Sequence, residues 1–230
     1  RVYARDASVT TSDTSVVGVA QPLRLGGLAY GGADGLQWGS RERAVDFYDV
    51  KGDVEALFAP RKVSFVATEH PALHPGRSAR VVLDGRDVGV VGELHPRWRQ
   101  GYELPSAPVV FELDLAALTE REVPSFKAVP RQQSVQRDLA LIVGDQVDAD
   151  ALLAALRDAP HQGLLRDARL FDVYRPTTPQ PGMADGERSL AVRLDLLDDN
   201  APLTDARCDE VVAALLAAAS SRTGARLRSA

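Results

Sequence analysis

The chain has 230 residues, of which 45% are hydrophobic and 26% charged, and its formal net charge is −5. These values are typical of a globular protein of about two domains and argue against binding to nucleic acid or anionic membranes by net charge alone. Cys208 is the single cysteine, which excludes an internal disulfide and a zinc site built on several thiolates. A single cysteine suits a reducing cytosol, so we expect a cytoplasmic location. No stretch approaches the roughly 20 apolar residues of a membrane span, so we expect no membrane partner.

The first half predicts an antiparallel sheet with few helices. Residues 46–59 read as the end of a strand followed by a short helix over 53–59, which Pro60 stops. The Asp84-Gly85 pair favours a hairpin turn, and Pro96 begins a short helix. Strands are expected at 23–29, 63–68, 79–85, 88–95 and 109–115.

A polar stretch with two prolines, 119–134, separates the halves. We therefore predict a first domain over 1–118, a linker over 119–129 and a second domain over 130–230. The first residue is not Met, and we expect a segment of a longer protein. The region 126–230 holds 13 of the 27 Lys and Arg residues and 15 of the 32 Asp and Glu residues, so neither half is basic and any RNA contact must be selective.

The second half predicts the order β-α-β-β-α-β, which is the ferredoxin-like plan. One helix is expected to end at Pro160, and the other to run from a Thr204 cap to Gly224, with Cys208 as a small core residue on its apolar stripe. Strands are expected at 137–143, 168–175, 189–197 and 225–229, with a long loop over 176–186.

In this plan both helices cover one face of the sheet and leave the other face open. The stretch "LFDVYR" (170–175) indicates which side chains lie on that open face. Strict alternation turns Phe171 and Val173 toward the helices, and it turns Leu170, Asp172 and Tyr174 to the opposite face. The same alternation adds further polar and small side chains to that opposite face: Ser189, Ala191, Arg193, Asp195, Arg226 and Arg228.

Such a face has the chemistry to bind single-stranded RNA. A tyrosine ring stacks on an unpaired base, a carboxylate accepts hydrogen bonds from the Watson–Crick edge of guanine, and arginines contact phosphates. The alternative interpretation is a solvated sheet face with Tyr174 half-buried at its edge.

Other candidate sites are weak. His70, His74 and His95 with Glu93 could suggest a metal site, but Pro71 and Pro75 disfavour a helix there, and we expect these histidines in turns with no metal bound. His161 follows a helix end, and we expect it at the surface or in the C-terminal turn. Lys51-Gly52 resembles a phosphate cradle but is explained by a strand-to-helix turn. No arginine-containing class II motif stands near "VVFELDL", so we expect no catalytic residue in this chain.

Several stretches together resemble the bacterial phenylalanyl-tRNA synthetase beta-subunit family. In the second half these are "RDLALIV", "LFDVYR", "ERSLAVRLDLL", "LTD" and "GARLR"; in the first half they are "VDFYDVKGDVEALF", "HPALHPGRSARV", "VGVVGELHP" and "VVFELDL". The resemblance covers nearly the whole chain in the family's order. The fold class that it implies is α+β: a partial class II synthetase-like antiparallel sheet domain, N-terminally incomplete and inactive, followed by a ferredoxin-like βαββαβ domain that binds the anticodon.

The resemblance also implies partners and site residues. Asp172, Tyr174 and Ser189 match the positions that meet the anticodon guanine of phenylalanine tRNA, while Arg193, Arg226 and Arg228 remain candidate phosphate contacts from the face analysis. The implied partners are the tRNA, the alpha subunit and a second beta subunit in a heterotetramer. ATP and magnesium are expected at the alpha subunit, and no cofactor in this chain.

Two departures from the family pattern affect the RNA contacts of the loops rather than those of the strands. Gln132-Gln133 stands where a Phe-Pro pair is common, and Arg175-Pro176 replaces a common Gly. Two alternative functions also stay open: a ferredoxin-like structural module that docks protein rather than RNA, and an enzyme fragment with an active site in the first half.

Overall fold

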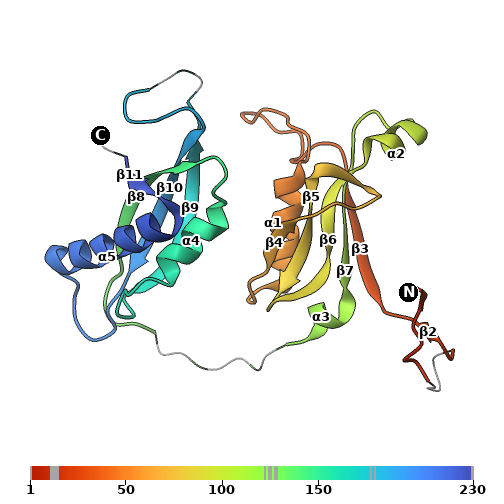
Figure 1. Cartoon of the computed structure of the whole chain (residues 1–230), viewed down its shortest axis with the longest axis horizontal. Helices are drawn as coiled ribbons and strands as arrows, with labels where there is room; N and C mark the ends of the chain where they lie inside the picture. Colours follow the sequence, from red (N-terminus) through yellow and green to blue (C-terminus); the bar gives the residue numbers. More distant parts are fainter. Residues whose placement is uncertain are drawn as a thin grey trace. The chain divides into compact units, whose positions relative to one another are not determined.

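The chain divides into two compact units, Arg1–Pro124 and Ser125–Ala230, each with its own hydrophobic core (Figure 1). The computed structural model describes residues 2–10, 16–121, 123, 126, 129–176, 178 and 180–228. The predicted linker, 119–129, contains five positions outside the described residues: 122, 124, 125, 127 and 128.

The first unit is built on a five-stranded antiparallel sheet in the order β3-β7-β6-β5-β4. A separate pair, β1 and β2, precedes it. The strand bounds are Ala4–Arg5 (β1), Val19–Ala20 (β2), Arg24–Ala29 (β3), Ser64–Ala67 (β4), Leu73–Leu83 (β5), Arg86–Leu94 (β6) and Val109–Asp114 (β7). The helices are Phe47–Phe58 (α1), Pro96–Gly101 (α2) and Leu115–Thr119 (α3).

Helix α1 begins six residues before the predicted start, so the expected strand end at 46–52 is wrong. The Asp46 carboxylate accepts the backbone N–H groups of Tyr48 and Asp49, and the Asp49 carboxylate accepts that of Asp46, which forms a capping box. Helical spacing then places Val50, Val54 and Phe58 on one buried stripe against the sheet. Local capping therefore outweighs the strand propensity of the residues at the helix start.

Two of the three histidines of the first unit accept hydrogen bonds from backbone groups. His70 Nδ1 and His95 Nδ1 accept the N–H groups of Ala72 and Arg97, as residues in turns do. His74 instead lies within β5, so its expected place in a turn is wrong. Within the described residues no three His, Cys, Asp or Glu side chains come together as a group that could hold a metal ion.

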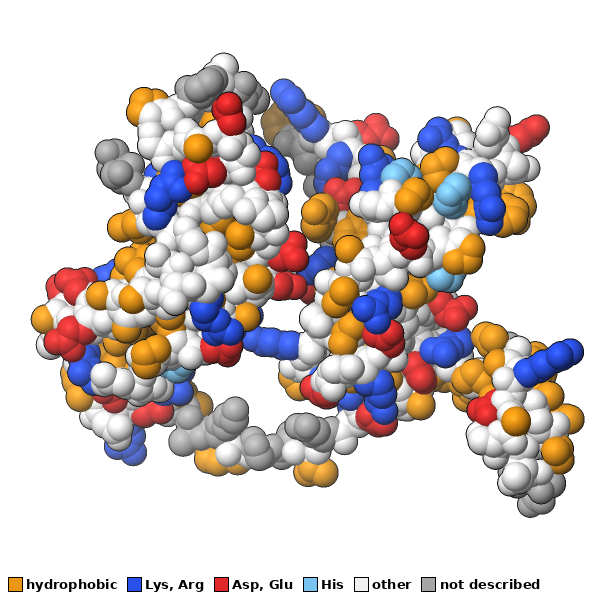
Figure 2. Space-filling view, viewed as in Figure 1, with side chains coloured by type: hydrophobic (Ala, Val, Ile, Leu, Met, Phe, Trp, Pro, Cys, Tyr) orange, Lys and Arg blue, Asp and Glu red, His pale blue; other side chains and the backbone are white. Residues whose placement is uncertain are grey.

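Figure 2 shows basic and acidic side chains interleaved over the visible face of each unit, in keeping with the net charge of −5. None of the described helices has both the length and the apolar character that crossing a bilayer requires.

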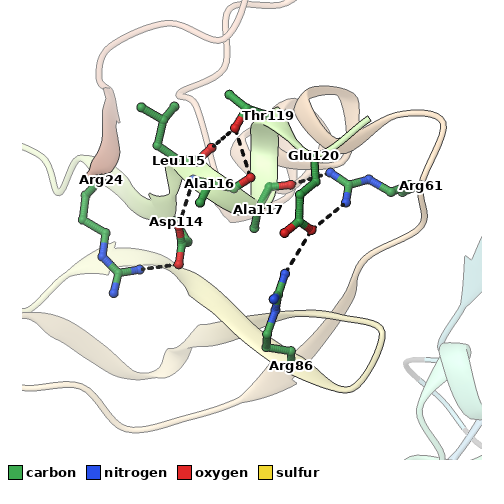
Figure 3. A network of polar contacts seen from close by, with 9 residues as sticks. All are labelled: Arg24, Arg61, Arg86, Asp114, Leu115, Ala116, Ala117, Thr119 and Glu120. Carbon is green, nitrogen blue, oxygen red and sulfur yellow. Dashed lines mark hydrogen bonds and ion pairs between the residues drawn. The ribbon is translucent and has the colours of Figure 1, made fainter. Parts of the chain in front are cut away.

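A polar network fixes the end of the first unit around α3 (Figure 3). Asp114 caps the helix by accepting the N–H of Ala116 over 2.9 Å. Arg61 donates to the Ala117 carbonyl, and the Glu120 carboxylate lies 3.2 Å from Arg86 and 3.8 Å from Arg61. These contacts hold the chain at the point where it leaves the first unit.

The second unit has the predicted ferredoxin-like fold. Its four strands form an antiparallel sheet in the order β11-β8-β10-β9, and one face of that sheet packs against both helices. The strands are Val135–Gly144 (β8), Leu165–Tyr174 (β9), Glu187–Leu196 (β10) and Arg226–Leu227 (β11); the helices are Ala149–Arg157 (α4) and Asp205–Thr223 (α5).

Helix α5 confirms the predicted caps, because Thr204 accepts the N–H of Arg207 and Gly224 ends the helix at a φ of 70°. Cys208 is buried in the core as expected. His161 follows α4, where its ring bonds to the Arg157 carbonyl and to the Leu165 N–H, which confirms the expected C-terminal turn position.

Central strand β10 supplies the middle of this core. Leu190, Val192, Leu194 and Leu196 are fully buried on the helix side, where the alternation predicts them. Each buried leucine contributes roughly 1.5–3 kcal/mol from burial of its side chain. The strand therefore packs against both helices on one face and leaves Ser189, Ala191, Arg193 and Asp195 on the opposite face.

We expect Leu194→Ala to lower the free energy of unfolding of the second unit by about 2–5 kcal/mol, because the truncation leaves a cavity among fully buried neighbours. Both tryptophans, Trp38 and Trp98, lie in the first unit, so tryptophan fluorescence reports that unit alone. Urea unfolding followed by circular dichroism should show the loss, while the fluorescence transition should not move. Leu113→Ala in the first unit is the matched control and should shift the fluorescence transition instead.

Candidate nucleic-acid interface

The residues predicted to bind RNA share the sheet face of the second unit that is turned away from α4 and α5, here called the open face. Strand pairing aligns Tyr174 of β9 with Ser189 of β10, Ser189 with Ile142 of β8, and Ile142 with Arg226 of β11. Since directly paired side chains lie on the same side of a sheet, this row crosses the open face from edge to edge.

In the neighbouring row of paired residues on the open face, the two central side chains are small. Asp172 of β9 pairs with Ala191 of β10, which pairs with Ala140 of β8, and the Arg228 N–H donates to the Ala140 carbonyl over 2.8 Å. The methyl groups of Ala191 and Ala140 lie between Asp172 and Arg228 and form a shallow strip across the sheet, here called the alanine strip. Asp172 is exposed, and among the described residues no hydrogen bond or ion pair engages its carboxylate.

Tyr174 is half-buried, and neighbours fix its ring on the open face. Gln180 donates its side-chain N–H to the Tyr174 hydroxyl over 2.6 Å. The guanidinium carbon of Arg228 lies 5.0 Å from the ring centroid, within the range of a cation–π contact. Because β11 and β9 are the two outer strands, the Arg228 side chain crosses the low alanine strip to reach the ring.

Ser189 and Ile142 lie between these outer residues and are both only 3% exposed. Ile142 is absent from the core under the helices, as its place on the opposite face requires. The Ser189 hydroxyl makes no hydrogen bond to other described residues, so its donor and acceptor are unused within the described part of the second unit.

Two of the three candidate phosphate contacts are already engaged within the protein. Arg193 binds the Asp138 carboxylate through Nε and Nη2, both at 2.7 Å. Arg226 binds Glu187, with 2.6 Å between Nη2 and Oε2, and also donates to the Gly182 carbonyl. Among the described residues Arg228 has no carboxylate partner, so it is the candidate with an unneutralised charge.

These pairs perturb the acids. Hydrogen bonds from the Arg226 side chain and then from the Ala184 N–H lower the pKa of Glu187 from 4.5 to about 2. The hydrogen bond from Arg193 likewise lowers the pKa of Asp138 below its ordinary value. Both carboxylates are therefore ionised at neutral pH and keep their arginines on the sheet.

The long loop, 176–186, is tied to the sheet at its base. Arg175 pairs with Asp145 over 2.7 Å, and the Asp145 N–H donates to the Gly186 carbonyl. Residues of the loop and of both strand ends line a cavity of about 270 Å³ beside these contacts. Positions 177 and 179 of the loop lie outside the described residues.

Strand β9 breaks the predicted alternation at one residue. Asp172 pairs with Ala191 while Leu170 pairs with Val192, so Phe171 is an extra residue at a β-bulge. Leu170 packs against the helix-side core, and Phe171 is 51% exposed with the Arg193 guanidinium carbon 5.1 Å from its ring centroid. The predicted directions of Leu170 and Phe171 are therefore wrong, whereas those of Asp172 and Tyr174 are unchanged.

The bulge had a signal in the sequence. The apolar side chains Ala168 and Leu170 are two residues apart and fit one alternation. Val173 follows Leu170 by three residues, so it fits an alternation of the opposite phase. The polar residues Arg169 and Asp172 are likewise three residues apart. One inserted residue between Leu170 and Asp172 reconciles the two patterns. Nothing in the sequence alone indicates the contacts of Tyr174 with Arg228 and Gln180, because they join distant segments.

The second unit is a ferredoxin-like module joined to a separate antiparallel-sheet domain, and comparison with known proteins agrees with this division. Residues 130–228 match the family model "Ferredoxin-fold anticodon binding domain", and residues 6–115 match "Phenylalanyl tRNA synthetase beta chain CLM domain".

Curated relatives match both halves at once. The chain is 50% identical over 232 aligned positions to the phenylalanine–tRNA ligase beta subunit of Ralstonia nicotianae, an alignment that covers 99% of this chain and 29% of the relative. The same subunits of Cupriavidus pinatubonensis and Bordetella parapertussis are 45% and 48% identical, over 99% and 96% of this chain and 28% and 29% of those proteins.

The chain belongs to the phenylalanine–tRNA ligase beta-subunit family. It spans less than a third of the length of the curated relatives that it matches.

The Arg226–Glu187 pair yields a pH prediction. A carboxylate whose pKa is lowered in the folded state stabilises that state above its unfolded pKa, and the contribution disappears as the pH falls from about 4.5 through about 2. We expect NMR titration of the Glu187 side chain to report a pKa near 2 in the unmodified chain. Arg226→Gln should return it toward 4.5, whereas Arg166→Gln, which removes a surface ion pair to Asp199, should leave it unchanged.

Proposed function

We propose that the open face binds the anticodon of phenylalanine tRNA and that the chain serves as a non-catalytic segment of a phenylalanine–tRNA ligase beta subunit. The observation that carries this proposal is the convergence of Tyr174, Asp172 and Ser189 on one face through strand register. The family membership supports it, because the matching model of the second unit is an anticodon-binding domain.

Each side chain has a distinct part in the proposed recognition. The Tyr174 ring offers a stacking surface for an unpaired base, a contact of roughly 1–3 kcal/mol. The Asp172 carboxylate accepts from the N–H donors of guanine, which adenine lacks in that arrangement. Ser189, paired with Tyr174 and diagonal to Asp172, presents its hydroxyl to the edge of the stacked base.

The arginines are proposed to help unequally. Arg228 lies over the Tyr174 ring, so an incoming base either stacks on the other side of the ring or takes the place of the guanidinium. A displaced Arg228 would then be available for a phosphate. Arg193 and Arg226 would first have to leave Asp138 and Glu187, so they contribute less to phosphate binding.

The remaining partners follow from the family and are proposed on that basis. We assign ATP, magnesium and the aminoacylation chemistry to the alpha subunit on the ground of the family alone. The first unit is proposed to be an inactive, class II-like domain that supports assembly with the alpha subunit in a heterotetramer of two alpha and two beta chains.

A protein-docking role of the open face is the alternative function. Its exposed Phe171 ring, half-buried Tyr174 ring and paired charges are also the chemistry of a protein contact. This alternative predicts that substitutions at Tyr174 leave RNA affinity unchanged.

We expect Tyr174→Ala to weaken binding of the whole chain to a phenylalanine anticodon stem-loop about 5- to 150-fold, the equivalent of one lost base–aromatic stack. Asp172→Ala should reduce the preference for that RNA over one whose anticodon guanine is replaced by adenine. Fluorescence anisotropy at low salt measures both effects. Tyr48→Ala, at an exposed tyrosine of the first unit, is the matched control and should bind as the unmodified chain does.

Equal affinity of both RNAs for the unmodified chain would reject base reading. Unchanged affinity in both the Tyr174 and Asp172 variants would reject the open face as the binding surface and favour the protein-docking role.

A further inference from the structure

The bulge at Phe171 places a second aromatic ring on the open face. Phe171 has no pairing partner on β10, because Leu170 and Asp172 take the adjacent partners Val192 and Ala191. Bulges commonly re-aim one side chain next to a functional site. Here the re-aimed ring leaves the helix-side core and stays half-exposed beside Asp172.

Arg193 confirms on which face the ring lies. Arg193 pairs with Asp138 of β8 and Arg169 of β9, in the next row of the open face beyond Ala191. Its guanidinium carbon is 5.1 Å from the Phe171 ring centroid, so the ring lies against the open-face side of Arg193.

The ring and the guanidinium form a preorganised pair. Two hydrogen bonds of 2.7 Å to Asp138 fix the orientation of the guanidinium plane. An arginine plane held in this way, next to an aromatic ring, offers the flat surfaces on which unpaired bases stack.

The spacing relative to Tyr174 suits a second base. Three residues along β9 separate Phe171 and Tyr174, about 10 Å at a rise of roughly 3.3 Å per residue. Stacked neighbours in a duplex strand are only about 3.4 Å apart, so one stack of bases does not bridge the two rings. An RNA loop whose bases are splayed apart can instead reach both, with Asp172 and the alanine strip between them.

We propose that Phe171 and Arg193 form a second base-stacking site, which takes an unpaired base adjacent to the one bound at Tyr174. This inference rests on the proposed RNA binding of the open face and adds a subsite to it. It also changes the proposed role of Arg193: instead of a phosphate contact, its guanidinium plane beside the Phe171 ring becomes part of the stacking surface, here called the platform.

The test uses the whole chain and anticodon stem-loops in which 2-aminopurine replaces, one at a time, the adenines that follow the guanine. Stacking changes the fluorescence of 2-aminopurine. We expect the signal change on binding at one of these positions to be lost in Phe171→Ala, with affinity about 5- to 150-fold weaker. Phe171→Tyr keeps an aromatic ring and should retain both the fluorescence change and the affinity, so it also controls for misfolding.

Val173→Ala is the matched control. Val173 lies on the same strand with 46% exposure, but it pairs with core residue Leu190 on the helix side. This variant should bind RNA as the unmodified chain does. If Tyr174→Ala weakens binding while Phe171→Ala behaves like Val173→Ala, the second site is rejected and the proposed function stands. If the unmodified chain fails to bind the stem-loop, both proposals are rejected.

Arg193→Lys separates the two roles of that arginine. Lysine keeps the charge but loses the plane, so a platform role predicts weaker binding with an unchanged dependence on salt concentration and a reduced 2-aminopurine signal change. Retained binding and a retained signal change in Arg193→Lys would reject the platform role of Arg193.

Discussion

The antiparallel pairing of β10 with both of its neighbours is the constraint on which the second unit depends. The period of a strand is two, so a slip of one residue on either side would exchange the buried leucines with the polar residues between them. Four fully buried side chains on the helix side oppose such a slip. The same register aligns Ser189 with Tyr174 and Ala191 with Asp172, so core packing positions the candidate interface.

Internal ion pairing removes net positive charge from the open face, because two of its arginines are neutralised by carboxylates. Arg193 and Arg226 are held by carboxylates, and both carboxylates have lowered pKa values that keep them charged at neutral pH. Under the proposed function, such a surface releases few counterions when RNA binds, so phosphate attraction contributes little to the affinity. Stacking and hydrogen bonds to base edges would then decide which RNA the proposed interface prefers, in keeping with a chain of which neither half is basic.

Much of the second unit could be predicted because its signals are local. Alternation in β10, the Thr204 cap and Gly224 each rest on a few neighbouring residues, and all agree with one fold. Strict alternation does not predict the bulge at Phe171, because it allows for no inserted residue. The strand propensity of residues 46–52 does not predict the early start of α1, because a capping box sets that start. The Arg228–Tyr174 contact joins outer strands and is set by tertiary structure alone.

The length of the relatives explains how a selective but weakly charged face can be useful. This chain corresponds to 28–29% of the relatives reported above, so under the proposed function other parts of the ligase also hold the tRNA. Tethering converts the anticodon contact into an intramolecular one with a high effective concentration. A face that is modest in affinity then discriminates between tRNAs through the base that it accepts, because the shared backbone contacts elsewhere are the same for the right and the wrong anticodon.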